Sequence, residues 1–289
     1  MSPLYTIIIP HHNSTETLKR LLNSIPTSDS FQVIVIDDCS DQSEVKELSM
    51  MKRSNVTYVF LKECRGAGVA RTKGLQLAQG EWILFADSDD YYLPNLEKTL
   101  DISIKSNSLA DIIIFNIDHK DNNSLQGKRY YNYISNFDGT DSSWIDIKYR
   151  TWTPWAKLFK RSFIQDHHLY FEPRKKGNDC FFVLNAVKNA KSIILEKNIE
   201  LYHLSYSPNS LSHSKNNQWD YMFDVYDLWM WRYRFFRINN IPLWKEYNIF
   251  YLLQEIKNKF GLKTMIRFLF HSFKYKYNYF TLLHSKIGK

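Results

Sequence analysis

The feature that most constrains the fold is an alternation of short apolar runs and helical patterns over the first hundred residues. Four runs are typical of buried strands: Leu4–Pro10, Gln32–Asp37, Val56–Leu61 and Glu81–Asp87. Between them, apolar residues recur at helical spacing at Leu18, Leu21, Leu22 and Ile25, and again over Val69–Ala78. This order predicts an α/β fold with a parallel sheet and helices on its faces.

Polar residues cluster where three of these strands end, in the runs Pro10-His11-His12-Asn13, Asp37-Asp38-Cys39-Ser40 and Asp87-Ser88-Asp89-Asp90. The carboxyl ends of parallel strands share one edge, where ligands bind. A helix cap or turn explains a single Asp in such a place equally well. Several carboxylates at one edge are costly without a cation or a donor-rich ligand. In the D-x-D pattern Asp87-Ser88-Asp89, hard oxygen ligands suit Mg²⁺ or Mn²⁺, which also bind diphosphate oxygens.

The rest of the chain is divided into two regions. In the first, we expect a strand over Asp111–Ile117, a loop over the polar stretch Asp118–Ser143, a helix over Asp179–Ala190 and a strand near Ile193–Leu204. From Gln218 onward the pattern predicts helices rich in aromatic residues. We therefore place a domain boundary between residues 216 and 217.

The net charge of +8 lies at the C-terminal end, because the eight Lys and Arg residues after Glu255 have no acidic residue among them. Over Gly261–Leu283 one helical face carries Leu262, Met265, Ile266, Leu269, Phe270, Phe273, Tyr277 and Phe280, while Lys263, Arg267 and Lys274 lie elsewhere. A basic amphipathic helix of this kind predicts binding to an anionic membrane surface. A helix packed on the catalytic domain with a solvated basic face explains the pattern equally well. No nucleic-acid-binding motif is present in the sequence, so we expect no nucleic-acid partner.

The cysteine pattern predicts free thiols. Cys39, Cys64 and Cys180 are odd in number and form no C-x-x-C pair, so we expect neither a disulfide framework nor a structural zinc site, and a reducing compartment. The sequence shows no signal-peptide pattern and no apolar run long enough for a membrane-spanning helix.

Five stretches together resemble the family 2 glycosyltransferases with the GT-A fold: TIIIPHHN, VIVIDDCSD, GAGVARTKGLQLAQGEWILFADSDDYY, WAKLFKRSF and GNDCFF. They occur in the family's order, cover the first hundred residues densely and thin out beyond residue 152. The resemblance implies an inverting bacterial enzyme of the polysaccharide, capsule or lipopolysaccharide type. It further implies a nucleotide-binding half over 1–100, an acceptor half over 101–216 and a C-terminal helical extension over 217–289.

The resemblance also implies roles at the donor side. Asp37 and Asp38 match the acidic pair that contacts uracil and ribose, and Arg71 matches an arginine near the base and diphosphate. Asp87 matches the carboxylate that faces ribose and sugar, next to Ser88, and Asp89 matches the metal ligand. Donor contacts are also expected from Pro10, His12, Gly66 and Lys157, with Gly66 and Gly68 letting the backbone pass close to the donor. An exposed helical arginine is the alternative for Arg71.

At the acceptor side, Asp179 matches the catalytic base, although Asn178 stands where the family usually has Glu. A helix N-cap is the alternative role for Asp179. His203 matches a histidine that completes the metal shell in some relatives, with His213 as a competitor. Trp152 and Trp155 are candidates for a sugar-stacking wall, with core packing at least as good an explanation.

The function implied is transfer of a sugar from a nucleotide-sugar, a UDP-sugar, to a hydroxyl of a glycan or lipid-linked glycan. We expect Mn²⁺ or Mg²⁺ as cofactor and a location at the inner face of the cell membrane. A non-catalytic protein of the same fold that assists membrane assembly is the alternative, with Asn178 as its only hint. A dinucleotide-dependent oxidoreductase is disfavoured, because Pro10-His11-His12-Asn13 replaces G-x-G-x-x-G after the first strand.

Overall fold

The computed structural model describes residues 2–118, 124–174, 177–205, 218–244 and 249–270. The chain divides into two compact units, Met1–His213 and Ser214–Lys289. Each unit is described below by itself. The roles assigned to the halves of the first unit stay predictions.

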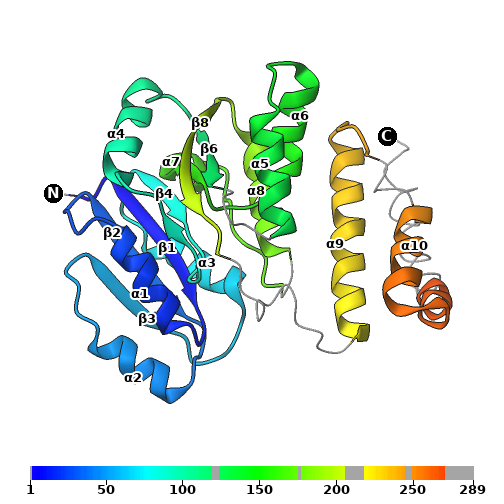
Figure 1. Cartoon of the computed structure of the whole chain (residues 1–289), viewed down its shortest axis with the longest axis horizontal. Helices are drawn as coiled ribbons and strands as arrows, with labels where there is room; N and C mark the ends of the chain where they lie inside the picture. The colour runs from blue at the N-terminus through cyan, green and yellow to red at the C-terminus, as the bar shows by residue number, and fades with distance from the viewer. Residues whose placement is uncertain (1, 119–123, 175–176, 206–217, 245–248, 271–289) are drawn as a thin grey trace. The chain divides into compact units, whose positions relative to one another are not determined.

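The described part of the first unit is built on a sheet with the strand order β3-β2-β1-β4-β7-β6-β8-β5 (Figure 1). Its strands are β1 (Tyr5–His11), β2 (Phe31–Asp37), β3 (Val56–Phe60), β4 (Trp82–Phe85), β5 (Tyr91–Tyr92), β6 (Ile112–Asp118), β7 (Lys157–Lys160) and β8 (Ile193–His203). The expected parallel arrangement holds for β1 to β4. The whole sheet is mixed, because β7 runs antiparallel between β4 and β6, and β5 runs antiparallel to β8.

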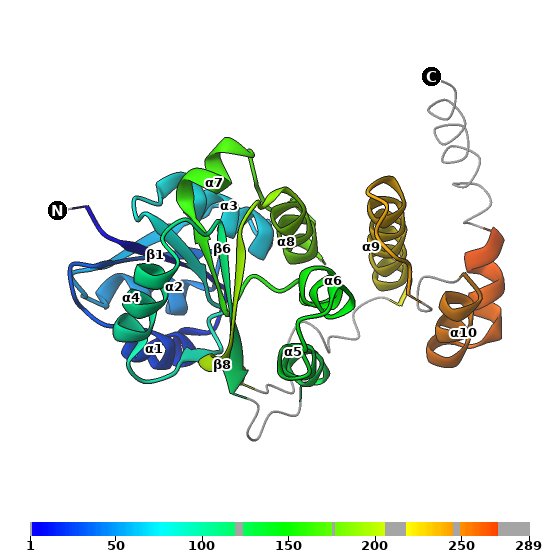
Figure 2. The same cartoon turned by 90° about the horizontal axis from the view of Figure 1, so that it is seen from above.

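The helices of this unit are α1 (Thr15–Ser24), α2 (Gln42–Met50), α3 (Ala67–Leu77), α4 (Leu96–Ser106), α5 (Leu125–Ser135), α6 (Asp141–Arg150), α7 (Arg161–Asp166) and α8 (Asn178–Asn189). α1 and α4 lie on one face of the sheet, and α3 and α8 lie on the other (Figure 2). α3 packs closely on β1, because a Cβ at Gly74 would collide with the side chain of Ile8. This contact fixes the start of α3 near the carboxyl edge of the sheet.

The prediction of a loop over Asp118–Ser143 is wrong for most of that stretch, since α5 and the start of α6 lie there. The Ser124 hydroxyl caps α5 by accepting from the Gly127 N–H at 3.2 Å. Tyr130 and Ile134, one turn apart, are buried on the core side of α5. These two apolar anchors were too sparse in a polar stretch to indicate a helix.

The second unit contains α9 (Gln218–Ile238), α10 (Ile249–Phe260) and a further helix over 262–270. The helices expected after Gln218 are therefore confirmed for the described residues. The expected tail residues Phe273, Lys274, Tyr277 and Phe280, like His213, lie outside the described residues. Among the helices that the structure describes, none is both long enough and apolar enough to cross a membrane.

Candidate functional site

The carboxyl ends of β1 and β2 meet through a buried hydrogen bond between side chains. His11 and Asp37 are register partners, and the His11 Nδ1 lies 2.8 Å from the Asp37 Oδ1. Both residues are only 1% exposed. The other Asp37 oxygen accepts from the Ser40 N–H at 3.0 Å. Asp37 is therefore bonded within this edge of the sheet, and its expected contact with a donor stays a prediction.

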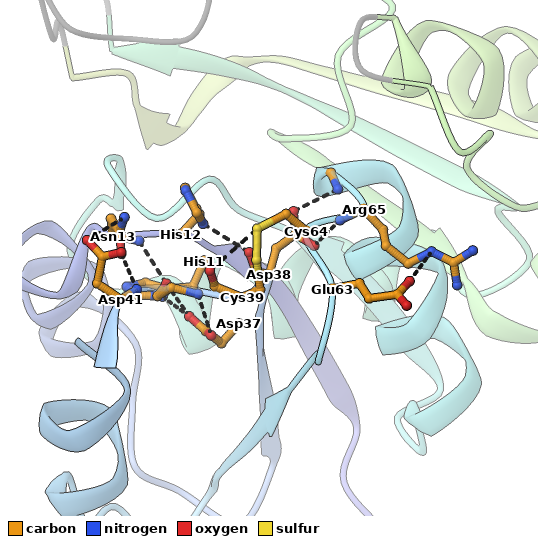
Figure 3. Close-up of a disulfide and its surroundings, with 12 residues drawn as sticks. His11, His12, Asn13, Asp37, Asp38, Cys39, Asp41, Glu63, Cys64 and Arg65 are labelled. Carbon is orange, nitrogen blue, oxygen red and sulfur yellow. Dashed lines mark hydrogen bonds and ion pairs between the residues drawn. A yellow bond between two sulfur atoms is a disulfide. The ribbon is translucent and has the colours of Figure 1, made fainter. Parts of the chain in front are cut away.

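Asp38 turns the other way and fastens the loop that leads into α3. Its two carboxylate oxygens accept from the N–H groups of Arg65 and Gly66, each at 2.7 Å (Figure 3). Gly66 has a φ of +86°, a conformation that glycine adopts without strain. The polypeptide thus passes directly beside the carboxylate that was expected to meet the nucleoside.

A disulfide between Cys39 and Cys64 joins the same two loops, with the two Cα atoms 5.0 Å apart (Figure 3). The expectation of free thiols is wrong for this pair, and only Cys180, which is buried, is free. The two cysteines are 25 residues apart in sequence and meet because β2 and β3 are neighbours. The cysteines therefore no longer argue for a reducing compartment.

His12 is exposed at the end of β1, and its Nδ1 donates to the Asp38 carbonyl at 2.9 Å. This bond holds the ring in place beside the Asp38 loop, where a contact with the donor is expected. Pro10 lies within β1 and is buried, so its contribution is to the strand. The Ser88 hydroxyl pairs with that of Ser14 at 2.8 Å and ties the D-x-D turn to the start of α1.

The turn after β4 carries three acidic residues, Asp87, Asp89 and Asp90, in different surroundings. Burial, with the charge of Asp87 beside it, raises the pKa of Asp89 to about 6. Asp90 is 2% exposed and accepts from the Tyr202 hydroxyl at 2.9 Å and the Ser205 N–H at 2.8 Å. Burial and the two neighbouring carboxylates raise its pKa well above the usual range. Asp90 is thus an internal anchor, which leaves Asp87 and Asp89 for a ligand.

Arg20 supports this turn from α1, and nothing in its sequence surroundings pointed to it. Its guanidinium donates to the Asp89 carbonyl and to the Ser205 hydroxyl, and lies over the Tyr91 ring. Its positive charge also lowers the pKa of Asp89, against the two larger effects that raise it.

His203 is not brought together with the two carboxylates. Its Nδ1 lies 3.1 Å from an Asp118 oxygen, and its ring stacks on Tyr91 with centroids 4.5 Å apart. Within the described parts of the chain, no three His, Cys, Asp or Glu side chains are arranged to hold a metal ion. The expected three-ligand shell of Asp87, Asp89 and His203 is therefore not assembled in this structure.

Arg71 connects the D-x-D turn to the start of α8. It is 6% exposed, which excludes the alternative of a solvated helical arginine. One terminal nitrogen donates to the Asp87 carboxylate at 2.5 Å and the other to the Asn178 side-chain oxygen at 2.9 Å. A Cβ at Gly68 would lie 2.5 Å from the Glu172 carbonyl oxygen and 2.8 Å from the Asn178 Cβ, so glycine here lets α3 lie against these two residues.

Asp179 follows in the first turn of α8 and is half-buried. One of its oxygens accepts from the Cys180 N–H at 2.8 Å. Burial raises the pKa of Asp179, with a further rise from Asp87 and an opposing effect from Arg71. A carboxylate with a raised pKa beside Arg71 and Asp87 has the properties of a general base.

The residues of the WAKLFKR stretch lie deeper than expected. Lys157 is 1% exposed, and its ammonium donates to the Thr153 carbonyl at 2.9 Å. Burial lowers its pKa well below the usual range, opposed by the charge of Asp179. Trp155 packs between Tyr130 and Tyr202 in the core, so core packing holds for it, and Trp152 packs half-buried against the same core.

Comparisons with known proteins identify the family of this chain. The model of the family "Glycosyl transferase family 2" matches residues 6–167, more than half of the chain. A poly(ribitol-phosphate) beta-glucosyltransferase of Bacillus spizizenii is 27% identical over 208 residues, which are 69% of this chain and 32% of the relative. This chain therefore spans about a third of that relative's length.

Solved structures show the same fold. The crystal structure of Staphylococcus aureus TarS 1-349 in complex with UDP-GlcNAc aligns with a TM-score of 0.66 and 23% identity, covering 88% of this chain and 72% of that one. A mannosyltransferase of Pyrobaculum calidifontis, in complex with GDP-Man and Mn²⁺, aligns with a TM-score of 0.55 and 15% identity, covering 92% and 74%. With the family model matched over most of the sheet, this chain belongs to glycosyl transferase family 2 and has the GT-A fold.

Proposed function

We propose that this protein is an inverting glycosyltransferase that moves a sugar from a UDP-sugar to a hydroxyl of a glycan or lipid-linked glycan. The observation that carries the proposal is the bridge made by Arg71, which binds Asp87 of the D-x-D turn and Asn178, the neighbour of Asp179. Transfer requires donor and acceptor to meet at one carbon atom, and this bridge brings together the motifs expected to serve each of them.

On the donor side, the Asp38 loop and the exposed His12 ring would face the nucleoside. Asp87 and Ser88 would face the ribose and the sugar. Support comes from two solved structures of TarS, one in complex with UDP-GlcNAc and the other in complex with UDP. Pro10, Asp37 and Lys157 would act from behind these groups, because all three are buried.

On the acceptor side, Asp179 would act as the base. The acceptor oxygen forms a bond to the anomeric carbon while the bond from that carbon to the diphosphate oxygen breaks on the opposite face. Asp179 takes the hydroxyl proton, and the electron pair of the broken bond leaves with the nucleoside diphosphate. The raised pKa of Asp179 improves its ability to accept that proton.

The two D-x-D carboxylates fit a divalent cation. Asp87 and Asp89 supply hard oxygen ligands from one turn, and the charge of Asp87 contributes to the raised pKa of Asp89. Bound Mn²⁺ or Mg²⁺ would offset charge on the departing diphosphate. The solved mannosyltransferase with GDP-Man and Mn²⁺ supports the same cofactor class.

The location proposed is the inner face of the cell membrane, with the acceptor belonging to a cell-surface polysaccharide. The relatives named poly(ribitol-phosphate) glycosyltransferases support a polymer acceptor. The alternative of a non-catalytic assembly partner is favoured by Asn178, which replaces the usual acidic residue. Against this alternative, the sequence has an Asp at position 179, the residue that we propose as the base.

A donor screen tests this proposal. The purified protein is incubated with a panel of UDP-, GDP- and dTDP-sugars and Mn²⁺, and release of the nucleoside diphosphate is measured. We expect turnover with one or a few UDP-sugars and its loss in EDTA. Absence of turnover with every donor would favour the non-catalytic partner, and full activity in EDTA would refute the D-x-D metal site.

A further inference from the structure

Three elements converge on the buried Arg71 side chain. Arg71 belongs to α3, Asp87 follows β4, and Asn178 begins α8. The guanidinium also lies 5.5 Å from the centroid of the Phe171 ring, which covers one of its faces. There is no room for a Cβ at Gly68, which would lie 2.5 Å from the Glu172 carbonyl oxygen and 2.8 Å from the Asn178 Cβ, so α3 lies directly against the Asn178 side chain here.

The bond from Arg71 to Asn178 restricts how Arg71 can lie. A guanidinium is a planar fork, so fixing one terminal nitrogen fixes the direction of the other. With one nitrogen on the Asn178 oxygen at 2.9 Å, the second points at the Asp87 carboxylate. Asn178 is 7% exposed, so water has little access to replace it as acceptor.

The neutral amide at position 178 also limits the negative charge. One guanidinium, that of Arg71, acts on both Asp87 and Asp179. A third carboxylate at position 178 would compete with Asp87 for the same nitrogen atoms. Asn178 supplies the acceptor without that charge, and its amide N–H₂ donates to the Arg174 carbonyl at 3.4 Å.

We propose that Asn178 is a positioning residue, whose amide oxygen directs Arg71 onto Asp87 and so fixes the D-x-D turn relative to the helix turn that carries Asp179. This inference rests on the proposed glycosyltransferase function. On this proposal, Asn178 takes the place of the Glu that the family usually has. Its presence then does not indicate a loss of activity. Its effect passes through Arg71, so the two residues are predicted to act as one unit.

A double-mutant cycle tests this dependence, with the variants Asn178→Ala, Arg71→Ala and the double variant measured for transfer rate and UDP affinity. Loosened geometry is expected to lower the kcat of Asn178→Ala by roughly 10- to 100-fold while the UDP dissociation constant stays within about threefold. The double variant is expected to match Arg71→Ala alone, because Asn178 has no separate effect once Arg71 is absent.

Asn185→Ala is the matched control, since Asn185 lies in the same helix and its side chain bonds to the Phe181 carbonyl at 2.8 Å. It is expected to keep the wild-type kcat. Multiplicative losses in the double variant, or a wild-type kcat in Asn178→Ala, would overturn the inference alone. If the wild-type protein turns over no donor, the proposed function and this inference both fail.

Discussion

At the scale of single residues, the burial of the Lys157 ammonium is the feature of the first unit that we least expected from the sequence. Its ammonium is buried, donates to the Thr153 carbonyl and lies 4.6 Å from the centroid of the Tyr130 ring. A buried ammonium without a bonded carboxylate destabilises a fold, because desolvation outweighs a single neutral acceptor. We therefore expect Lys157 to have a functional role behind the donor groups, where the charge of Asp179 opposes the lowering of its pKa.

Lys157→Met is therefore expected to raise the free energy of unfolding by about 1 kcal/mol or more and to reduce transfer. The pKa of Lys157 is lowered in the folded state, so protons bind preferentially to the unfolded chain. The stability gain should shrink as the pH rises towards 10.5, the ordinary pKa of the group. Chemical denaturation of the wild-type protein and the variant at several pH values measures this stability gain.

Lys160→Met, at the end of the same strand, is the control for Lys157→Met. The Lys160 ammonium is less buried and donates to the Ser108 carbonyl at 3.0 Å, so no comparable gain is expected. A loss of stability in Lys157→Met with transfer intact would show that Lys157 has a structural role only.

At the scale of elements, the sequence predicted the strands and helices whose apolar residues form dense local patterns. β1, β2, β4 and α8 lie close to their expected places. β7 was missed, because four residues that pair antiparallel between two distant strands carry little local signal. The clusters of polar residues at the strand ends could be predicted from the order of the strands along the chain. The hydrogen-bond partners of each side chain could not be predicted in this way, because they depend on tertiary contacts.

The same distinction explains the errors in the site. The D-x-D pattern and Asp179 could be read along the chain. The pairing of His203 with Asp118 depends on the register of β8 with β6, and Arg20 reaches the D-x-D turn only because α1 packs beside it. The Cys39–Cys64 pair depends on the neighbouring positions of β2 and β3. Local periodicity carries none of this information.

The disulfide between the loops after β2 and β3 gives a direct prediction. Protein purified without reductant and then denatured should show one reactive thiol per chain, that of Cys180, and three after reduction. Because Cys39 adjoins Asp38 and Cys64 adjoins Arg65, reduction should also weaken UDP binding. Three reactive thiols before reduction would show that the pair is not joined in solution.

At the scale of the whole molecule, the second unit exposes apolar and basic side chains on one helix. In the helix over 262–270, Phe268 is 1% exposed, whereas Leu262, Ile266 and Phe270 are 53%, 42% and 75% exposed. Lys263 and Arg267 are exposed on the adjoining positions. The helix thus packs through one side and presents apolar and basic residues together on another. It combines features of the two interpretations of the tail, a membrane-binding helix and a packed helix with a solvated basic face.

We expect the full-length protein to co-sediment with anionic vesicles at low salt. Replacing Leu262, Ile266 and Phe270 by Ser should release it, because the apolar contact is lost. High salt should weaken binding, because salt shortens the Debye length to about 3 Å near 1 M and so screens the attraction between basic residues and anionic lipids. Neutral vesicles are the control, and failure of the wild-type protein to bind anionic vesicles would refute the membrane proposal.

The central claim, that Asp179 is the base of a glycosyl transfer, is tested most directly by Asp179→Asn. The variant keeps the size of the side chain and removes its ability to take a proton. The measurement is the transfer rate with the donor that the wild-type protein uses, alongside UDP affinity by calorimetry. We predict a transfer rate lower by ~10²–10⁴ with UDP affinity nearly unchanged. A transfer rate within about tenfold of wild type would contradict the assignment.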